Sequence, residues 1–162
     1  MLLLLARLGL RAQDVITLCL DDIDWADGRF NLRPGKTRRA RSLPLPQDVG
    51  QAVVAYVQGG RPRSDSRQVF LRCRPPFQPL TNSAVWWMVR QAFQHAGLVT
   101  RPGIASHIFR HTAASQMLNH GASFKEVADV LGHQSLQTTG IYAKVELEAL
   151  AAVALPWGGA VQ

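Results

Sequence analysis

Six side chains of this sequence could together carry out chemistry on a phosphodiester. They are Arg11, Lys36, His107, Arg110, His133 and Tyr142. Arginine forks neutralise the non-bridging oxygens of a phosphate, and of its more highly charged transition state, through bidentate hydrogen bonds. A tyrosine can attack the phosphorus to give a covalent phosphoenzyme, and a lysine can protonate the departing oxygen. The set therefore predicts phosphoryl transfer to Tyr142, provided that these residues converge in space.

The chemistry that this set supports uses neither a metal nor a cofactor, and we expect none. The sequence shows no carboxylate cluster and no Cys/His spacing typical of a metal site. Its two cysteines, Cys19 and Cys73, are too few for a disulfide framework. Reduced thiols and a cytoplasmic location are the corresponding expectation.

The composition is that of one globular domain with a preference for polyanions. The 162 residues are 47% hydrophobic and 18% charged, and the formal net charge is +7. This length fits a single domain over residues 1–162. The positive excess favours nucleic acid as the partner, and an anionic membrane surface only after it. The apolar start is interrupted by Arg7, far short of the about 18 residues that a membrane span needs, so we expect a buried helix and no membrane contact.

The hydrophobic pattern predicts a mainly α-helical fold with a small three-stranded antiparallel β-sheet. A hairpin over residues 29–45, with Lys36 at its tip, supplies two strands, and residues 69–72 supply the third. Helices are expected over residues 2–8, 11–20, 46–58, 81–96, 106–119, 123–131, 136–143 and 146–154. His107 and Arg110 then lie on the first turns of one helix, where a spacing of three residues puts both on one side.

Capping residues define several of these helix boundaries. Thr81 and Ser123 are the expected N-caps, and Glu126 stands three residues after Ser123 in a capping-box pattern. Glycines follow the expected C-terminal ends, where a left-handed residue commonly closes a helix. They are Gly9, Gly97, Gly121 and Gly132.

The sequence closely resembles the tyrosine recombinase, or phage integrase, family. Any one of the matching motifs is weak, but their order and spacing from residue 8 to about residue 145 are specific in combination. They are Gly9-Leu10-Arg11 with Asp14, Gly35-Lys36 with Leu43-Pro44-Leu45, His107 and Arg110-His111-Thr112-Ala113, Leu131-Gly132-His133 with Thr138-Thr139, and Ile141-Tyr142.

The resemblance implies a role for each residue of the set. Arg11 and Arg110 would grip the scissile phosphate, and His133 would hydrogen-bond one of its oxygens. Lys36 would be the general acid, and His107 would support proton transfer at the nucleophile. Tyr142 would attack, which leaves a 3′-phosphotyrosine and a free 5′-hydroxyl.

Two departures from the family pattern stand out. The turn that usually runs Gly-Lys-Gly is here Gly35-Lys36-Thr37, and threonine constrains that turn. The sequence also lacks the N-terminal domain that in the family closes over the DNA, together with about the first helix of the catalytic domain. We therefore expect a truncated catalytic domain, and the activity of this chain alone is the open question.

The implied function is that of a site-specific DNA recombinase or integrase, typical of a mobile element, that cleaves and rejoins duplex DNA. The implied assembly is a homo-tetramer on DNA, joined through the C-terminal helix. Two alternatives remain: a non-catalytic DNA-binding fragment of a recombinase, and a type IB topoisomerase-like enzyme that relaxes DNA without pairing two duplexes.

Several neighbouring residues keep two interpretations. Asp14 is either an acid on a helix surface or a support for the arginine beside it, as often found in the family. Residues 38–41, which are rich in arginine, form either a solvated hairpin tip or contacts to a phosphate backbone. Residues 86–88 favour core or interface packing over base stacking, and His111 favours a structural role.

Overall fold

The computed structural model describes residues 1–34, 40–98 and 107–132. Three of the six candidate site residues, Lys36, His133 and Tyr142, lie outside these ranges, as do the helices expected over residues 136–143 and 146–154. The described helices are α1 (Leu2–Leu8), α2 (Ala12–Thr17), α3 (Gln47–Ala55), α4 (Asn82–His95), α5 (His107–Asn119) and α6 (Phe124–Leu131), with a 3-10 turn η1 (Leu20–Asp22) and a π-helical turn η2 (Tyr56–Gly60).

A three-stranded antiparallel sheet occurs, as expected, but its third strand is not the predicted one. The strands are β1 (Ile23–Asp24), β2 (Arg29–Leu32) and β3 (Arg41–Pro44), in the order β1-β2-β3. The hairpin register pairs Phe30 with Leu43, and both side chains are buried. The expectation of a strand over residues 69–72 was wrong.

Main-chain pairing outside the sheet explains both that error and the length of α2. The amide of Val69 donates to the carbonyl of Leu18 at 2.8 Å, and the amide of Leu20 donates to the carbonyl of Arg67 at 2.8 Å. These bonds hold residues 18–20 against residues 67–69 in an extended form. The helix predicted over residues 11–20 therefore ends at Thr17. Residues 69–72 do not join the sheet, because Val69 pairs with Leu18 instead.

The capping predictions are confirmed where the residues are described. The Thr81 hydroxyl accepts from the amide of Ala84 at 3.3 Å at the start of α4. The Glu126 carboxylate accepts from the amide of Ser123 at 2.7 Å at the start of α6. Left-handed glycines follow α1, α4, α5 and α6, namely Gly9, Gly97, Gly121 and Gly132.

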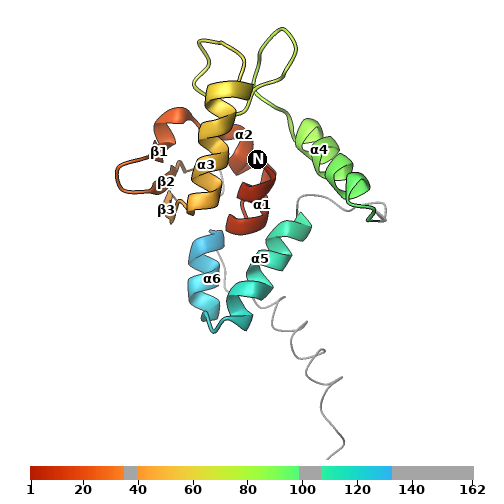
Figure 1. Ribbon diagram of the computed structural model, residues 1–162. Helices are drawn as coiled ribbons and strands as arrows, with labels where there is room; N and C mark the ends of the chain where they lie inside the picture. The colour runs from red at the N-terminus through yellow and green to blue at the C-terminus, as the bar shows by residue number, and fades with distance from the viewer. Residues whose placement is uncertain (35–39, 99–106, 133–162) are drawn as a thin grey trace, which may run out of the picture.

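The apolar side chains form two clusters. The larger joins α1, α2, the sheet, α3 and α4, and its fully buried members include Leu4, Leu5, Leu10, Val15, Phe30, Val49, Val69, Val85 and Val89. The smaller lies between α5 and α6 and contains Ala114, Val127 and Leu131. Helix α5 lies along α1, and α6 lies along α5 (Figure 1), so the α5–α6 pair meets the larger cluster at the end of α1.

Helix α4 does not bury the residues for which we predicted core or interface packing. It packs through Val85 and Val89, both 0% exposed, whereas Trp86 is 40% and Trp87 is 58% exposed. Residues 86–88 therefore do not belong to the core, because the two valines, four residues apart, already fill the buried face of this helix, and the interface interpretation stays a prediction.

Candidate functional site

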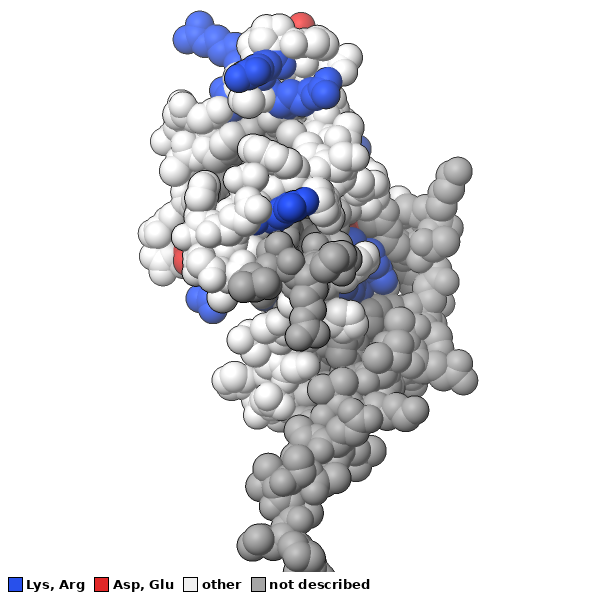
Figure 2. Space-filling model, turned by 90° about the vertical axis from the view of Figure 1, so that its right-hand side faces the viewer, with Lys and Arg blue, Asp and Glu red and all other residues white. Residues whose placement is uncertain are grey.

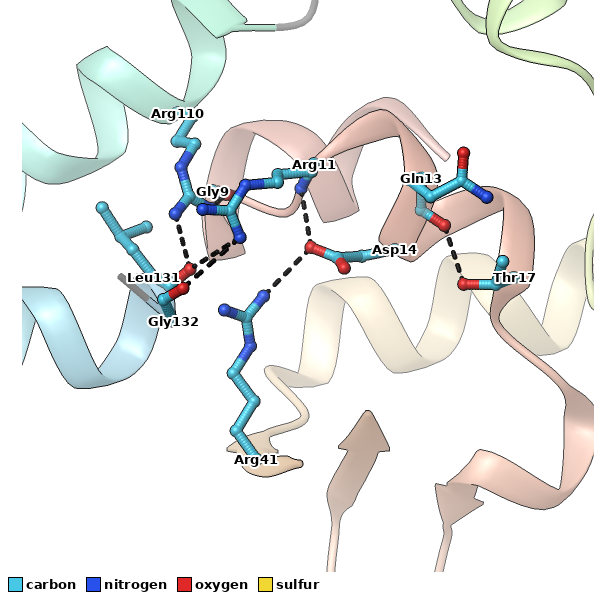
Figure 3. A network of polar contacts seen from close by, with 9 residues as sticks. All are labelled: Gly9, Arg11, Gln13, Asp14, Thr17, Arg41, Arg110, Leu131 and Gly132. Atoms are coloured by element: carbon cyan, nitrogen blue, oxygen red, sulfur yellow. Dashed lines mark hydrogen bonds and ion pairs between the residues drawn. The ribbon is translucent and has the colours of Figure 1, made fainter. Parts of the chain in front are cut away.

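The turn between α1 and α2 brings Arg11 to the site. Helix α1 ends at Gly9, whose φ of 59° is the left-handed conformation that glycine adopts without strain. Arg11 is the N-cap of α2, and its extended backbone turns its side chain toward the C-terminal end of α6 (Figure 3). The Nη1 atom of Arg11 lies 3.5 Å from the carbonyl oxygens of both Leu131 and Gly132.

Arg110 reaches the same place from α5. Its guanidinium donates to the carbonyl oxygen of Gly9 at 2.8 Å and to that of Leu131 at 2.5 Å. The residue is only 5% exposed. The carbonyl of Leu131 is thus within hydrogen-bonding range of both arginines, and it belongs to the last turn of α6, where unpaired carbonyls carry partial negative charge. Arg11 and Arg110, which are 99 positions apart in the sequence, thus lie together at the end of α6.

Close packing of main chain supports this convergence. A Cβ atom built on Gly9 would lie 2.7 Å from Cδ2 of Leu131 and 3.2 Å from Cβ of Ala113. Only a glycine lets the α1–α2 turn approach α5 and α6 this closely. The position of Arg11 relative to Arg110 therefore depends on the absence of a side chain at Gly9.

His107 shares a hollow with Arg11. It is the first residue of α5 and is exposed. An open cavity of about 570 Å³ lies between α2, α4 and α5 and is lined by Arg11, Ala12, Gln13, Asn82, Ser83, Trp86 and His107. The structure thus brings together Arg11, His107 and Arg110. His111, one turn beyond His107 on α5, is exposed and takes part in a further interaction.

Trp86, for which we predicted core or interface packing, lines this hollow. The guanidinium carbon of Arg90, one turn later on α4, lies 5.4 Å from the centre of its ring. An exposed aromatic ring beside cationic groups can stack on a base. The sequence signal for this was the spacing of Val85 and Val89, which leaves Trp86 on the exposed side.

Asp14 and Arg41 form a buried ion pair at the site, which the sequence did not predict. Asp14 is 7% exposed and so does not lie on a helix surface. Its Oδ2 atom accepts from the amide of Arg11 at 3.0 Å and from Nη2 of Arg41 at 3.0 Å. Arg41 is the first residue of β3, and its side chain is 11% exposed, so the interpretation of residues 38–41 as a solvated tip does not hold for it.

No helix among the described residues is long and apolar enough to cross a membrane. Within those same ranges, no group of three or more His, Cys, Asp or Glu side chains is arranged to hold a metal ion. The described side chains at the site include the guanidinium groups of Arg11 and Arg110 and the indole of Trp86.

Comparison with known proteins gives this arrangement a family. The model of the phage integrase family matches residues 1–148. The chain belongs to the phage integrase family.

Three relatives match 91–100% of the length of this chain. It is 50% identical to the Sinorhizobium fredii protein y4rA, assigned to the integrase/recombinase class, over 100% of this chain and 39% of y4rA. It is 36% identical to y4gC of the same organism over 96% of this chain and 80% of y4gC. Tyrosine recombinase XerA of Thermococcus kodakarensis is 33% identical over 91% of this chain and 51% of XerA. The chain thus spans about half or less of y4rA and XerA.

Solved structures of recombinases have the same fold. A crystal structure of XerA recombinase superposes with a TM-score of 0.77 at 24% identity, covering 95% of this chain and 57% of XerA. The site-specific recombinase XerH, solved bound to its difH substrate, superposes with a TM-score of 0.75 at 20% identity, covering 95% of this chain and 44% of XerH. The predicted fold class, a tyrosine recombinase catalytic-domain fold, is confirmed.

Proposed function

We propose that this chain is the catalytic domain of a site-specific recombinase that cleaves and rejoins duplex DNA through a 3′-phosphotyrosine. The observation that supports it best is the meeting of Arg11 and Arg110 at the carbonyl oxygen of Leu131. Two guanidinium groups side by side suit a phosphate whose charge rises in the transition state. Membership of the phage integrase family supports the proposal that Tyr142 is the nucleophile and Lys36 the general acid.

The proposed reaction has two transesterification steps. The phenolic oxygen of Tyr142 attacks the phosphorus, the bond from phosphorus to the 5′ oxygen breaks, and Lys36 gives that oxygen a proton. His107 assists removal of the phenolic proton, while His133 and the two arginines hold the non-bridging oxygens. In the second step a 5′-hydroxyl attacks, the bond from phosphorus to Tyr142 breaks, and the phenol regains its proton. One phosphodiester replaces another, so the reaction needs no nucleotide.

Duplex DNA is the proposed partner. XerH and the Tn1549 transposon integrase, which share this fold, were solved bound to DNA. The chain carries a net charge of +7, and basic side chains are more prominent than acidic ones on the face shown in Figure 2. Contacts between Lys or Arg and phosphates release counterions, so binding should weaken steeply with salt.

Strand exchange between two duplexes takes four protomers, and the proposal includes a homo-tetramer on DNA. Its contacts are assigned to residues 146–154, which lie outside the described residues. The proposal also places the protein in the cytoplasm, where DNA is accessible and thiols stay reduced.

A nicked suicide substrate tests the proposal. Duplexes that bind the protein are first selected from a randomised library. A nick is then placed near the cleavage position, so that the short product diffuses away and the covalent intermediate accumulates. The expected result is a covalent protein–DNA adduct on a denaturing gel, absent for Tyr142→Phe. The chain contains two tyrosines, so Tyr56→Phe is the matched control and keeps the adduct.

The other outcomes identify the alternatives. Retention of DNA without an adduct points to a DNA-binding fragment. An adduct with relaxation of supercoiled DNA, but without exchange between duplexes, points to a topoisomerase-like enzyme. An adduct that persists in Tyr142→Phe contradicts the assignment of the nucleophile.

A further inference from the structure

The side chain of Arg41 points into the protein, although Arg41 belongs to a basic run on the β-hairpin. It begins β3, and its guanidinium lies against the N-terminal end of α2 and the C-terminal end of α6 (Figure 3). Its side chain is 11% exposed, and that of its partner Asp14 is 7% exposed. Burial alone does not set the role of this arginine, because Arg110 is even less exposed, at 5%, so the contacts that Arg41 makes decide it.

The first contact of Arg41 reaches Arg11 through Asp14. One carboxylate oxygen, Oδ2, accepts both Nη2 of Arg41 and the main-chain amide of Arg11, each at 3.0 Å. A buried carboxylate needs a cation and hydrogen-bond donors to stay charged. Arg41 supplies the cation, and the oriented carboxylate in turn fixes the first residue of α2, from which the Arg11 side chain extends.

The second contact of Arg41 reaches the acceptors of Arg11. A Cβ atom built on Gly132 would collide with the Arg41 guanidinium and would lie 3.4 Å from its Cδ. The guanidinium therefore rests on the main chain of Gly132, whose φ is 64°. The carbonyl oxygen of that same residue lies 3.5 Å from Nη1 of Arg11. Arg41 thus contacts both segments between which Arg11 is held.

We propose that Arg41 is a positioning residue of the recombinase site. It acts through Asp14 and Gly132 to hold the guanidinium of Arg11 in register with that of Arg110, and it does not itself contact the scissile phosphate. This inference rests on the proposed function of the same site. It predicts that loss of Arg41 slows cleavage without weakening DNA binding.

The test compares Arg41→Met with Arg7→Met in the full chain. Arg7 also pairs with an aspartate, Asp48, at 2.9 Å, but its side chain is 62% exposed and the pair belongs to α1 and α3. Under single-turnover conditions with saturating DNA, Arg41→Met should form the adduct about 100-fold more slowly, as expected for a misplaced catalytic group. The Kd for duplex DNA should stay within about threefold of wild type, a difference below 1 kcal/mol. Arg7→Met should change neither quantity.

A conservative variant guards against loss of the fold. Arg41→Lys keeps the charge and one donor for Asp14 but loses the flat guanidinium that rests on Gly132. Its cleavage rate should lie between those of wild type and Arg41→Met. Wild-type rates in both variants would overturn the proposal, and so would a Kd that rises as much as the rate falls, because Arg41 would then be a DNA contact.

A second readout separates this inference from the proposed function. If the wild-type chain forms no adduct, the proposed function fails, but the amide of Arg11 still reports on positioning in the absence of DNA. Its nuclear magnetic resonance signal should shift, and its hydrogen exchange should accelerate, in Arg41→Met and not in Arg7→Met. An unchanged Arg11 amide in Arg41→Met would overturn the inference whatever the wild-type activity.

Discussion

The guanidinium of Arg110 donates a 2.8 Å hydrogen bond to the main-chain carbonyl of Gly9, a residue 101 positions earlier in the sequence. A second bond of 2.5 Å joins it to the carbonyl of Leu131. Arg110 therefore connects the α1–α2 turn to the end of α6, across the boundary between the two apolar clusters. In the proposed reaction the same side chain grips the phosphate, so one residue serves both the fold and the chemistry.

This dual role predicts that Arg110→Met destabilises the protein as well as inactivating it. The substitution removes the arginine donor of the Gly9 carbonyl and leaves the Leu131 carbonyl only its 3.5 Å contact with Arg11, and each unsatisfied buried group costs about 1–3 kcal/mol. Urea unfolding followed by tryptophan fluorescence should show a loss of about 2–5 kcal/mol. Arg90→Met, at an exposed arginine of α4, is the control and should stay within about 0.5 kcal/mol of wild type. Equal stability of the two variants would contradict the dual role.

A pair of glycines with nearly equal φ separates backbone strain from crowding. Gly9 has φ 59° and Gly28 has φ 60°, but a Cβ meets Leu131 at 2.7 Å at the first and nothing within 4 Å at the second. Gly28→Ala should cost about 1–2 kcal/mol, the penalty of a left-handed alanine. Gly9→Ala should cost about 1–3 kcal/mol more because the methyl group crowds α6. Equal losses of unfolding free energy in the two variants would mean that α6 moves aside for the methyl group without an energetic penalty.

The capping box of α6 predicts a pH-dependent contribution to stability. The amide and hydroxyl of Ser123 donate to the Glu126 carboxylate and lower its pKa from the ordinary value of 4.5. Because the folded-state pKa is the lower one, the contribution is complete above pH 4.5 and is lost as pH falls through the folded-state pKa.

The measurement compares Glu126→Gln with wild type at pH 7 and at pH 3. Glu126→Gln should lower the unfolding midpoint at pH 7 and converge with wild type at the acid end. Asp65→Asn, at an exposed aspartate of the loop that follows η2, serves as a carboxylate control. A Glu126→Gln deficit that persists unchanged in acid would show that the carboxylate charge is not the source.

The proposed general acid predicts a specific rescue. Lys36→Ala should slow cleavage of a normal phosphodiester by about 10²–10⁴-fold, the usual contribution of general acid catalysis. A substrate with sulfur in place of the bridging 5′ oxygen releases a thiolate, which needs no proton. Lys36→Ala should cleave that substrate at nearly the wild-type rate.

Lys125→Ala is the matched control for this experiment, because Lys125 is an exposed lysine on α6. It should cleave both substrates like wild type. If sulfur does not restore cleavage in Lys36→Ala, then this lysine contributes by another route, such as phosphate binding.

Local signals allowed much of the fold to be predicted. The caps at Thr81 and Ser123 and the glycines that end the helices act within four residues of their partners, so their chemistry is legible in a single sequence. The hairpin was predicted for the same reason. The third strand was not predicted, because β1 has only two residues and is too short to show an alternating pattern. Residues 69–72 were taken for it instead, because the pairing of residues 67–69 with residues 18–20 spans a distance in sequence that no local pattern reports.

The site residues also differ in whether a local pattern in the sequence reveals them. Arg11, His107 and Arg110 were found from motif spacing and the family resemblance, and the structure brings them together. For Arg41 the sequence offered a solvated hairpin tip or a phosphate contact, and not the buried pair with Asp14, because that partner is 27 positions away and the charge of a side chain does not reveal its direction. The core half of the prediction for Trp86 was wrong because aromatic residues favour burial on average, whereas Val85 and Val89 fill the buried face.

The contacts of the Leu131 carbonyl restrict the rotamers of Arg11 and Arg110 before any ligand binds. A free arginine side chain loses up to about 2 kcal/mol of rotamer entropy when it is immobilised. Here the acceptor at the end of α6 holds Arg110 by a 2.5 Å bond and lies 3.5 Å from Arg11, without DNA. Most of that ordering has occurred on folding, so in the proposed reaction the phosphate would meet side chains that are already aligned.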